Sequence, residues 1–169
     1  MKKSHFIVGV LLFLSLCISF YGCQNTLLTE QRFITQLSDI AKQDAVAAPE
    51  LLAQTEEQKS YQINENATLD TVADPDTDAL QSLILVLNTP TGSSYDREIL
   101  SYYILNIPTI LHPGITIADI NELYATLLPS DLSDEFEQTI TYHDVTYQMS
   151  ISDSTVTLHV TLEVCSAAN

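Results

Sequence analysis

Basic residues are scarce in this sequence, and none follows Arg97. The 169 residues contain six lysines and arginines against 22 aspartates and glutamates, which gives a formal net charge of −16. Nucleic acid binding needs a basic surface that neutralises phosphates, so we exclude it. A lipid-headgroup site built from basic side chains is excluded for the same reason.

Glycine is also rare, with four residues in the whole chain. That leaves little material for a phosphate-binding loop of the Walker or Rossmann kind. No serine occupies a G-x-S-x-G turn. His112, His143 and His159 have no partner at metal-ligand spacing, and we interpret them as surface residues. We therefore expect no catalytic residues and no cofactor.

The most informative feature that is present is an apolar N-terminal segment. Lys2 and Lys3 precede an apolar run from Phe6 to Phe20. This run has about 15 residues, whereas a membrane-spanning helix needs roughly 20. The pattern predicts a cleaved signal peptide over residues 1–22. Phe20-Tyr21-Gly22-Cys23 resembles the cleavage box of bacterial lipoproteins, which implies a lipid-modified Cys23.

Acylation of Cys23 would anchor the protein outside the cytoplasm, on the cell membrane or the outer membrane. All 22 acidic residues follow Cys23 and only four basic residues accompany them, so the mature chain would carry a net charge of −18. In the alternative, Cys23 carries no lipid and forms a disulfide with Cys165, because an exported chain reaches an oxidising compartment.

Residues 23–77 are polar, and we predict a lipid-anchored tether with one or two helices. Apolar residues at helical spacing indicate one helix around residues 33–41. Pro49 suits the first turn of a second helix over residues 50–59. Residues 60–78 contain little apolar material and are predicted to be a flexible connector. Alternatively, the first helix docks on the domain that follows.

Residues 78–165 are predicted to form a small α+β domain. About three helices are followed by a C-terminal three-stranded antiparallel β-meander. Helices are expected after Asp78 and after Ser94, and a third after Thr116. The segment Thr116-Ile-Ala-Asp119 reads as a capping box for that third helix.

Strict alternation of apolar and polar residues predicts the strands. It runs over residues 145–152 and 155–164, on either side of a tight turn at Asp153-Ser154. A third strand is expected before the turn at His143-Asp144.

With two-residue turns, Ile151 faces Val156 and the final strand lies at an edge of the sheet. An edge strand offers unpaired backbone groups to which a partner can add a strand. The predicted interaction edge consists of Thr155, Thr157, His159, Thr161 and Glu163.

Asp74, Asp76 and Asp78 form a D-x-D-x-D run, the opening of a calcium-binding loop. A full loop requires glycine at its sixth position and glutamate at its twelfth, and this chain has Ala79 and Leu85 there. We therefore prefer helix capping by Asp78 and keep the three aspartates as candidate metal ligands.

Gly114-Ile-Thr-Ile-Ala-Asp-Ile-Asn-Glu-Leu123, followed by a meander, resembles small envelope lipoproteins of the BamE type. Those domains begin a helix with a Gly-x-Thr signal and continue into antiparallel strands. The resemblance implies a scaffold or interaction role.

Taken together, these patterns predict an exported, lipid-anchored cell-envelope lipoprotein. We expect it to act as a protein-interaction or accessory module without catalytic activity, with the membrane and an envelope protein as its partners. One alternative is a surface lipoprotein that binds a small ligand or an ion. Another is a hydrolase with two catalytic carboxylates, because some of the 22 acids will be neighbours in any fold.

Overall fold

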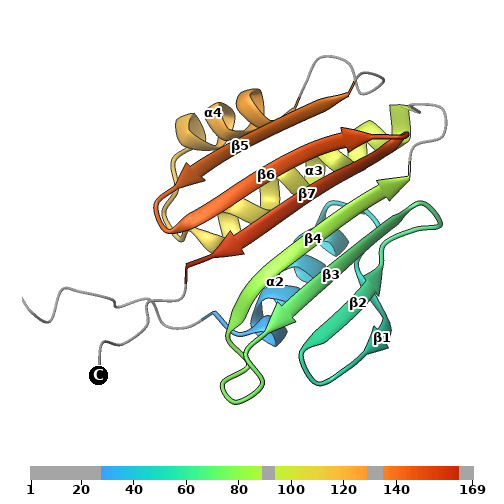
Figure 1. The fold of residues 1–169 in the computed structure, drawn as a ribbon, viewed down its shortest axis with the longest axis vertical. Helices are drawn as coiled ribbons and strands as arrows, with labels where there is room; N and C mark the ends of the chain where they lie inside the picture. Colours follow the sequence, from blue (N-terminus) through green and yellow to red (C-terminus); the bar gives the residue numbers. More distant parts are fainter. Residues whose placement is uncertain (1–27, 89–93, 129–134, 164–169) are drawn as a thin grey trace, which may run out of the picture. The chain divides into compact units, whose positions relative to one another are not determined.

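The computed structural model describes residues 28–88, 94–128 and 135–163, except the side chains of residues 94–96. Its elements are, in chain order, α2 (Glu30–Gln43), β1 (Glu50–Gln54), β2 (Gln58–Gln62), β3 (Ala67–Ala73), β4 (Leu80–Asn88), α3 (Ser94–Leu111), α4 (Ile117–Leu127), β5 (Phe136–Tyr142), β6 (Val145–Ser152) and β7 (Thr155–Leu162). The strands form a single sheet, shown in Figure 1.

The sheet order is β1-β2-β3-β4-β7-β6-β5, and every neighbouring pair is antiparallel. β4 and β7 join the two halves of the chain at the centre, with Leu85 opposite Leu158. In the first half, α2 precedes the four-stranded meander β1–β4, and in the second half, α3 and α4 precede the three-stranded meander β5–β7. In both halves the last strand of the meander is the one at the centre of the sheet.

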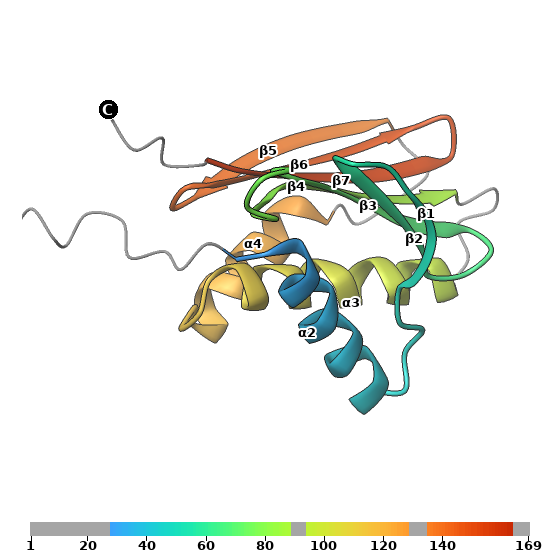
Figure 2. The ribbon, with the colours of Figure 1, turned by 90° about the horizontal axis from the view of Figure 1, so that it is seen from below.

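The three helices cover one face of this sheet, as Figure 2 shows from the side. Alternate strand residues point toward the helices, because successive side chains of a strand lie on opposite faces. Leu83, Leu85 and Leu87 of β4 are buried in this layer, and so are Phe33 and Leu37 of α2. These residues belong to one hydrophobic cluster that extends through both halves of the sheet.

Several predicted elements are confirmed. α4 begins after Thr116 with the expected capping box, in which Thr116 and Asp119 each accept the other's backbone N–H. β5, β6 and β7 form the predicted meander, and Ile151 lies opposite Val156. Asp153 and Ser154 have φ values of 50° and 64°. Positive φ at both central residues is what a type I′ hairpin turn requires.

The predicted fold class is wrong in its sheet. The described residues contain a seven-stranded antiparallel sheet, not a three-stranded meander preceded by three helices. The segment predicted to be a helix after Asp78 is β4, the strand at the centre. Its core, Leu83-Ile-Leu-Val-Leu87, is apolar at every position, and such a short run fits a buried strand as well as a helix.

The predicted tether is also replaced by ordered structure over residues 28–77. Only its first helix exists, as α2, and it docks on the sheet through Phe33 and Leu37, which are fully buried. The predicted second helix over residues 50–59 and the connector over residues 60–78 are instead β1, β2 and β3. The strands were missed because their alternation is short and is carried by small or polar residues such as Ala67 and Thr71.

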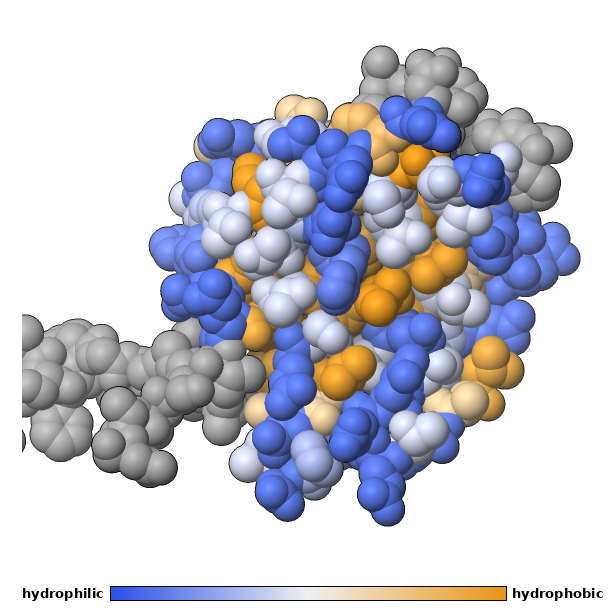
Figure 3. Space-filling view, viewed as in Figure 1, coloured by the Kyte–Doolittle hydropathy of each residue, from blue (hydrophilic) through white to orange (hydrophobic). Residues whose placement is uncertain are grey.

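None of the described helices lies on the opposite face of the sheet, and Figure 3 views the molecule from this side. Its central strands place Ile84 and Val86 beside His159 and Thr157. Thr and Ser side chains dominate elsewhere, so the face is hydrophilic with small apolar patches in Figure 3. Among the described residues, no helix is long and apolar enough to cross a bilayer.

Candidate functional site

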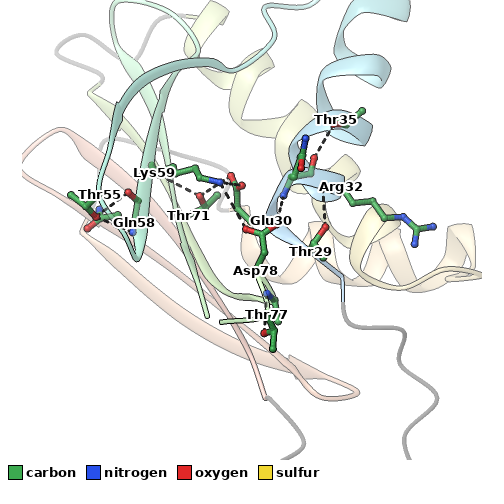
Figure 4. Close-up of polar contacts among 12 residues, drawn as sticks. Thr29, Glu30, Arg32, Thr35, Thr55, Gln58, Lys59, Thr71, Thr77 and Asp78 are labelled. Carbon is green, nitrogen blue, oxygen red and sulfur yellow. Dashed lines mark hydrogen bonds and ion pairs between the residues drawn. The ribbon is translucent and has the colours of Figure 1, made fainter. Parts of the chain in front are cut away.

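The most distinctive polar site lies where the first turn of α2 meets β2 and β3 (Figure 4). Thr29 caps the helix, and its side-chain oxygen accepts the backbone N–H of Arg32 at 3.3 Å. Glu30 is the first helical residue, where a negative charge is favoured by the helix dipole. The Glu30 N–H donates to the carbonyl oxygen of Asp78 at 2.9 Å, so the turn before β4 fixes this end of the helix.

Glu30 is 1% exposed, yet it carries a carboxylate. Lys59 Nζ of β2 lies 2.6 Å from its Oε2. The hydroxyl groups of Tyr61 and Thr71 both donate to Oε1, Thr71 at 3.2 Å. A buried carboxylate needs this set of partners, because burial removes the hydration of the charge.

The register of β2 and β3 brings these donors together. Lys59 lies opposite Thr71 in the sheet, and Tyr61 follows Lys59 by two residues and so points to the same face. Burial raises the pKa of the Tyr61 phenol, and the hydrogen bond to the Glu30 carboxylate raises it further. Tyr61 therefore stays protonated and keeps donating to Glu30.

A cavity of about 160 Å³ opens beside this network. Pockets for drug-sized ligands occupy about 300–1,000 Å³, so this one suits a few water molecules or one small group. Its charged lining consists of a single ammonium group and five carboxylates, from Lys59, Glu30, Glu56, Glu57, Asp74 and Asp78. The excess of negative charge favours a cationic group.

The D-x-D-x-D run lies at the rim of this cavity but does not form a metal cluster. Asp74 Oδ1 accepts hydrogen bonds from the backbone N–H groups of Asp76 and Thr77, at 3.0 and 2.9 Å, and from the Thr77 hydroxyl at 2.9 Å. These bonds, led by the hydroxyl, lower the pKa of Asp74. Within the described segments, no three His, Cys, Asp or Glu side chains are placed to hold a metal ion.

Asp78 was predicted to cap a helix that follows it, but it lies at the first turn of α2 instead. No helix follows it, and its φ of 56° turns the chain into β4. Its Oδ2 instead lies 3.5 Å from the backbone N of Gln31, in the first turn of α2. Its Oδ1 also lies 3.9 Å from Lys59 Nζ.

A second polar cluster joins the end of α3 to the β5–β6 turn. His112 Nε2 lies 2.8 Å from the hydroxyl of the buried Tyr147. The His112 ring also packs edge-on against Tyr142, with 4.9 Å between ring centroids, and lies near His143. Burial lowers the pKa of His112, and His143 lowers it further, against an opposing effect of Asp144.

His112 is therefore half-buried and not the surface residue that we expected. Tyr147 is fully buried, and burial raises the pKa of its phenol. The pair connects the two layers of the second half of the chain. His112 and Tyr147 are 35 positions apart, so no local sequence motif signals their contact.

The predicted interaction edge is not an edge. Thr155, Thr157, His159 and Thr161 lie on β7, which pairs with β4 on one side and with β6 on the other. Glu163 follows the strand, and its N–H donates to the carbonyl oxygen of Asp144 at 2.9 Å. The backbone of β7 is thus already used within the sheet, and strand addition at this position is ruled out.

The lipid-attachment candidate Cys23 and its alternative partner Cys165 lie outside the described residues. The sequence analysis did not identify the buried network, and a helix-capping residue at Thr29, before the periodic Phe33 and Leu37, is the one local signal near it. Glu30, Lys59, Tyr61 and Thr71 come from three elements, and only the fold unites them.

Comparison of the chain with protein-family models, with curated proteins and with solved structures found no match. The function is therefore argued from the residues and the geometry above.

Proposed function

We propose that this protein is an exported, lipid-anchored envelope protein whose α+β domain binds another protein and has no catalytic activity. The observation that carries the proposal is the one-sided sheet. Helices cover one face, and the other face and the edge strand β1 carry no covering element among the described residues (Figures 1 and 2). Such surfaces are available to a partner.

The anchor rests on the leader and on Cys23. Leu28, the first described residue, is five positions after Cys23. A chain spans at most about 3.6 Å per residue, so this link allows at most about 18 Å. The proposed anchor therefore holds the domain against the membrane, in place of the long spacer that the sequence suggested.

The chemistry of the site supports a non-catalytic role. A general acid of the glycosidase type requires a carboxyl group whose pKa is raised. The pKa values of Asp74 and Asp119 are instead lowered, in each case mainly by a threonine hydroxyl. Both oxygens of the buried Glu30 carboxylate already accept from side chains of the protein, Oε2 from Lys59 and Oε1 from Tyr61 and Thr71.

Intact mass of the membrane-extracted native protein tests the anchor. We expect a chain that begins at Cys23 and carries a diacylglycerol-sized increase in mass. A free protein, a retained leader, or a loss of two hydrogens from a Cys23–Cys165 disulfide would each refute it. In-cell crosslinking tests the second part, and we expect adducts with a second envelope protein that a Cys23→Ser variant no longer forms.

Binding of a small cation is a second candidate function, and the acidic cavity favours it. Calorimetric titration with calcium, and separately with a small primary amine such as putrescine, distinguishes binding of a metal ion from binding of an organic cation. Heat of binding that disappears in an Asp74→Asn variant would support a cation-binding role. Titrations without heat or thermal shift would leave the interaction role.

A further inference from the structure

The sheet has two true edges, β1 and β5. All five residues of β1 are exposed, and within the described segments β1 pairs only with β2. Three large apolar side chains are exposed among the described residues, and two of them are on this strand. They are Leu51 and Leu52, at 57% and 60%, and the third is Ile117 of α4 at 79%. Exposed apolar side chains on an edge strand favour the addition of a further strand.

β5 offers a much weaker edge. α4 packs against it, and its most exposed side chains are Glu137, Thr139 and Thr141. By contrast, β1 has no lysine or proline, the residues that commonly protect an edge from pairing. Its protection is limited to its short length, the charge of Glu50 at its start and a bulge at Leu52, which together restrict a partner to a short stretch of pairing.

The charges around β1 are negative. Glu50 begins the strand, and Glu56 and Glu57 follow it in the turn to β2. Gln54, the last residue of β1, lines the acidic cavity together with Glu56 and Glu57. A strand added along β1 therefore ends beside this cavity. Lys59, which lines the same cavity, is already bonded to Glu30.

We propose that β1 accepts an extended segment of a different protein, in which apolar side chains alternate with lysine or arginine. The backbone of β1 would supply the pairing, and Leu51 and Leu52 would cover the apolar side chains. A basic side chain at the Gln54 end would enter the acidic cavity. This inference rests on the proposed interaction function and specifies its surface.

A second copy of this chain is a poor occupant of the same edge. Pairing β1 with its own copy would bring two sets of Glu50, Glu56 and Glu57 together. Like charges at an interface oppose association, whereas a basic segment neutralises them. The charge pattern thus selects a basic partner over self-association.

Synthetic nine-residue peptides test the proposal with the purified mature chain. One alternates leucine with lysine, and its matched control replaces every lysine by glutamate. We expect the lysine peptide to bind with micromolar to millimolar affinity, and more weakly as salt rises. Its binding should slow amide hydrogen exchange over residues 50–54. The glutamate peptide should bind at least tenfold more weakly.

Variants separate the apolar contribution from general charge attraction. Leu51→Ser combined with Leu52→Ser should weaken binding of the lysine peptide at least tenfold, whereas Ile117→Ser, at an even more exposed apolar residue, should not change it. Glu56→Gln combined with Glu57→Gln should weaken binding severalfold, and Glu122→Gln on α4 should not. Because all of these side chains are exposed, the variants should fold like the parent.

Four results would overturn the proposal. They are equal affinity for the leucine variant, protection of amides on β5 or on the helix-free face, a dimer that depends on Leu51 and Leu52, and no binding of the lysine peptide at about 1 mM. These results would exclude β1 as the binding surface. They would not change the intact mass expected for a chain acylated at Cys23, or the adducts expected from in-cell crosslinking. Failure of the proposed function appears in those two measurements alone.

Discussion

Removing the Lys59 ammonium while keeping its aliphatic stem is the sharpest test of the network around Glu30. Lys59→Met leaves a carboxylate that is 1% exposed with only the hydroxyls of Tyr61 and Thr71 as partners. Breaking a buried ion pair on one side costs about 3–5 kcal/mol. The Lys59 side chain is 26% exposed, so water already screens part of the pair. We therefore expect a loss of about 2–3 kcal/mol in the free energy of unfolding.

Urea unfolding followed by circular dichroism measures this loss as a shift of the midpoint at constant slope. For a domain of this size, the same change lowers the melting temperature by roughly 6–15 °C. Lys42→Met is the matched control, because Lys42 is exposed in the last turn of α2, the helix that carries Glu30. It should cost under about 0.5 kcal/mol.

A double-mutant cycle then identifies the cause. Glu30→Gln keeps the shape of the side chain but removes its charge, and it should restore at least about 1 kcal/mol when added to Lys59→Met. Additive losses in the cycle, or a Lys59→Met variant as stable as the Lys42→Met control, would show that the charge of Lys59 does not hold Glu30 in place.

Three further predictions concern other parts of the fold. Because the folded-state pKa of His112 is lowered, the unfolded chain binds more protons below about pH 6.5. Stability should thus fall as the pH drops from 7.5 to 5.5. His112→Gln should flatten this part of the urea-midpoint profile, and a His159→Gln control that flattens it equally would contradict the assignment. Thr116→Ala should cost about 1 kcal/mol by urea unfolding through the lost helix cap, and no change would contradict that role. Leu85→Ala, at the fully buried centre of β4, should cost about 2–5 kcal/mol, whereas an equal cost for Val86→Ala on the helix-free face would contradict the assigned register.

The second half of the chain was largely predictable because its signals are local. The alternation in β6 and β7 and the turn residues Asp153-Ser154 determine a register that involves only neighbouring strands. The capping box of α4 lies within four residues. Where the turn and the strand pattern agree, sequence reasoning reached the correct pairing.

The first half was not predictable in this way. Within residues 58–73, Lys59, Tyr61 and Thr71 lie among other polar side chains, and nothing in the local pattern indicates that all three bind Glu30 of α2. The prediction that β7 is an edge strand was also wrong. The place of β7 depends on its pairing with the distant strand β4, and the apolar run at residues 83–87 had been interpreted as a helix. Contacts between the halves cannot be read from local periodicity.

Among the described strands, β4 and β7 are the only pair that joins the two halves of the sheet, and this pairing suggests where the molecule can be divided. A backbone cut between residues 88 and 94 would leave one α-then-meander piece on each side, each with its own helix to cover its strands. Each piece alone would present a long unpaired strand, and mixing the two should regenerate the native circular dichroism spectrum. The halves also meet where α3 contacts α2 and the Tyr103 hydroxyl donates to the carbonyl oxygen of Ala47, so recombination would report the combined strength of this contact and the β4–β7 pairing.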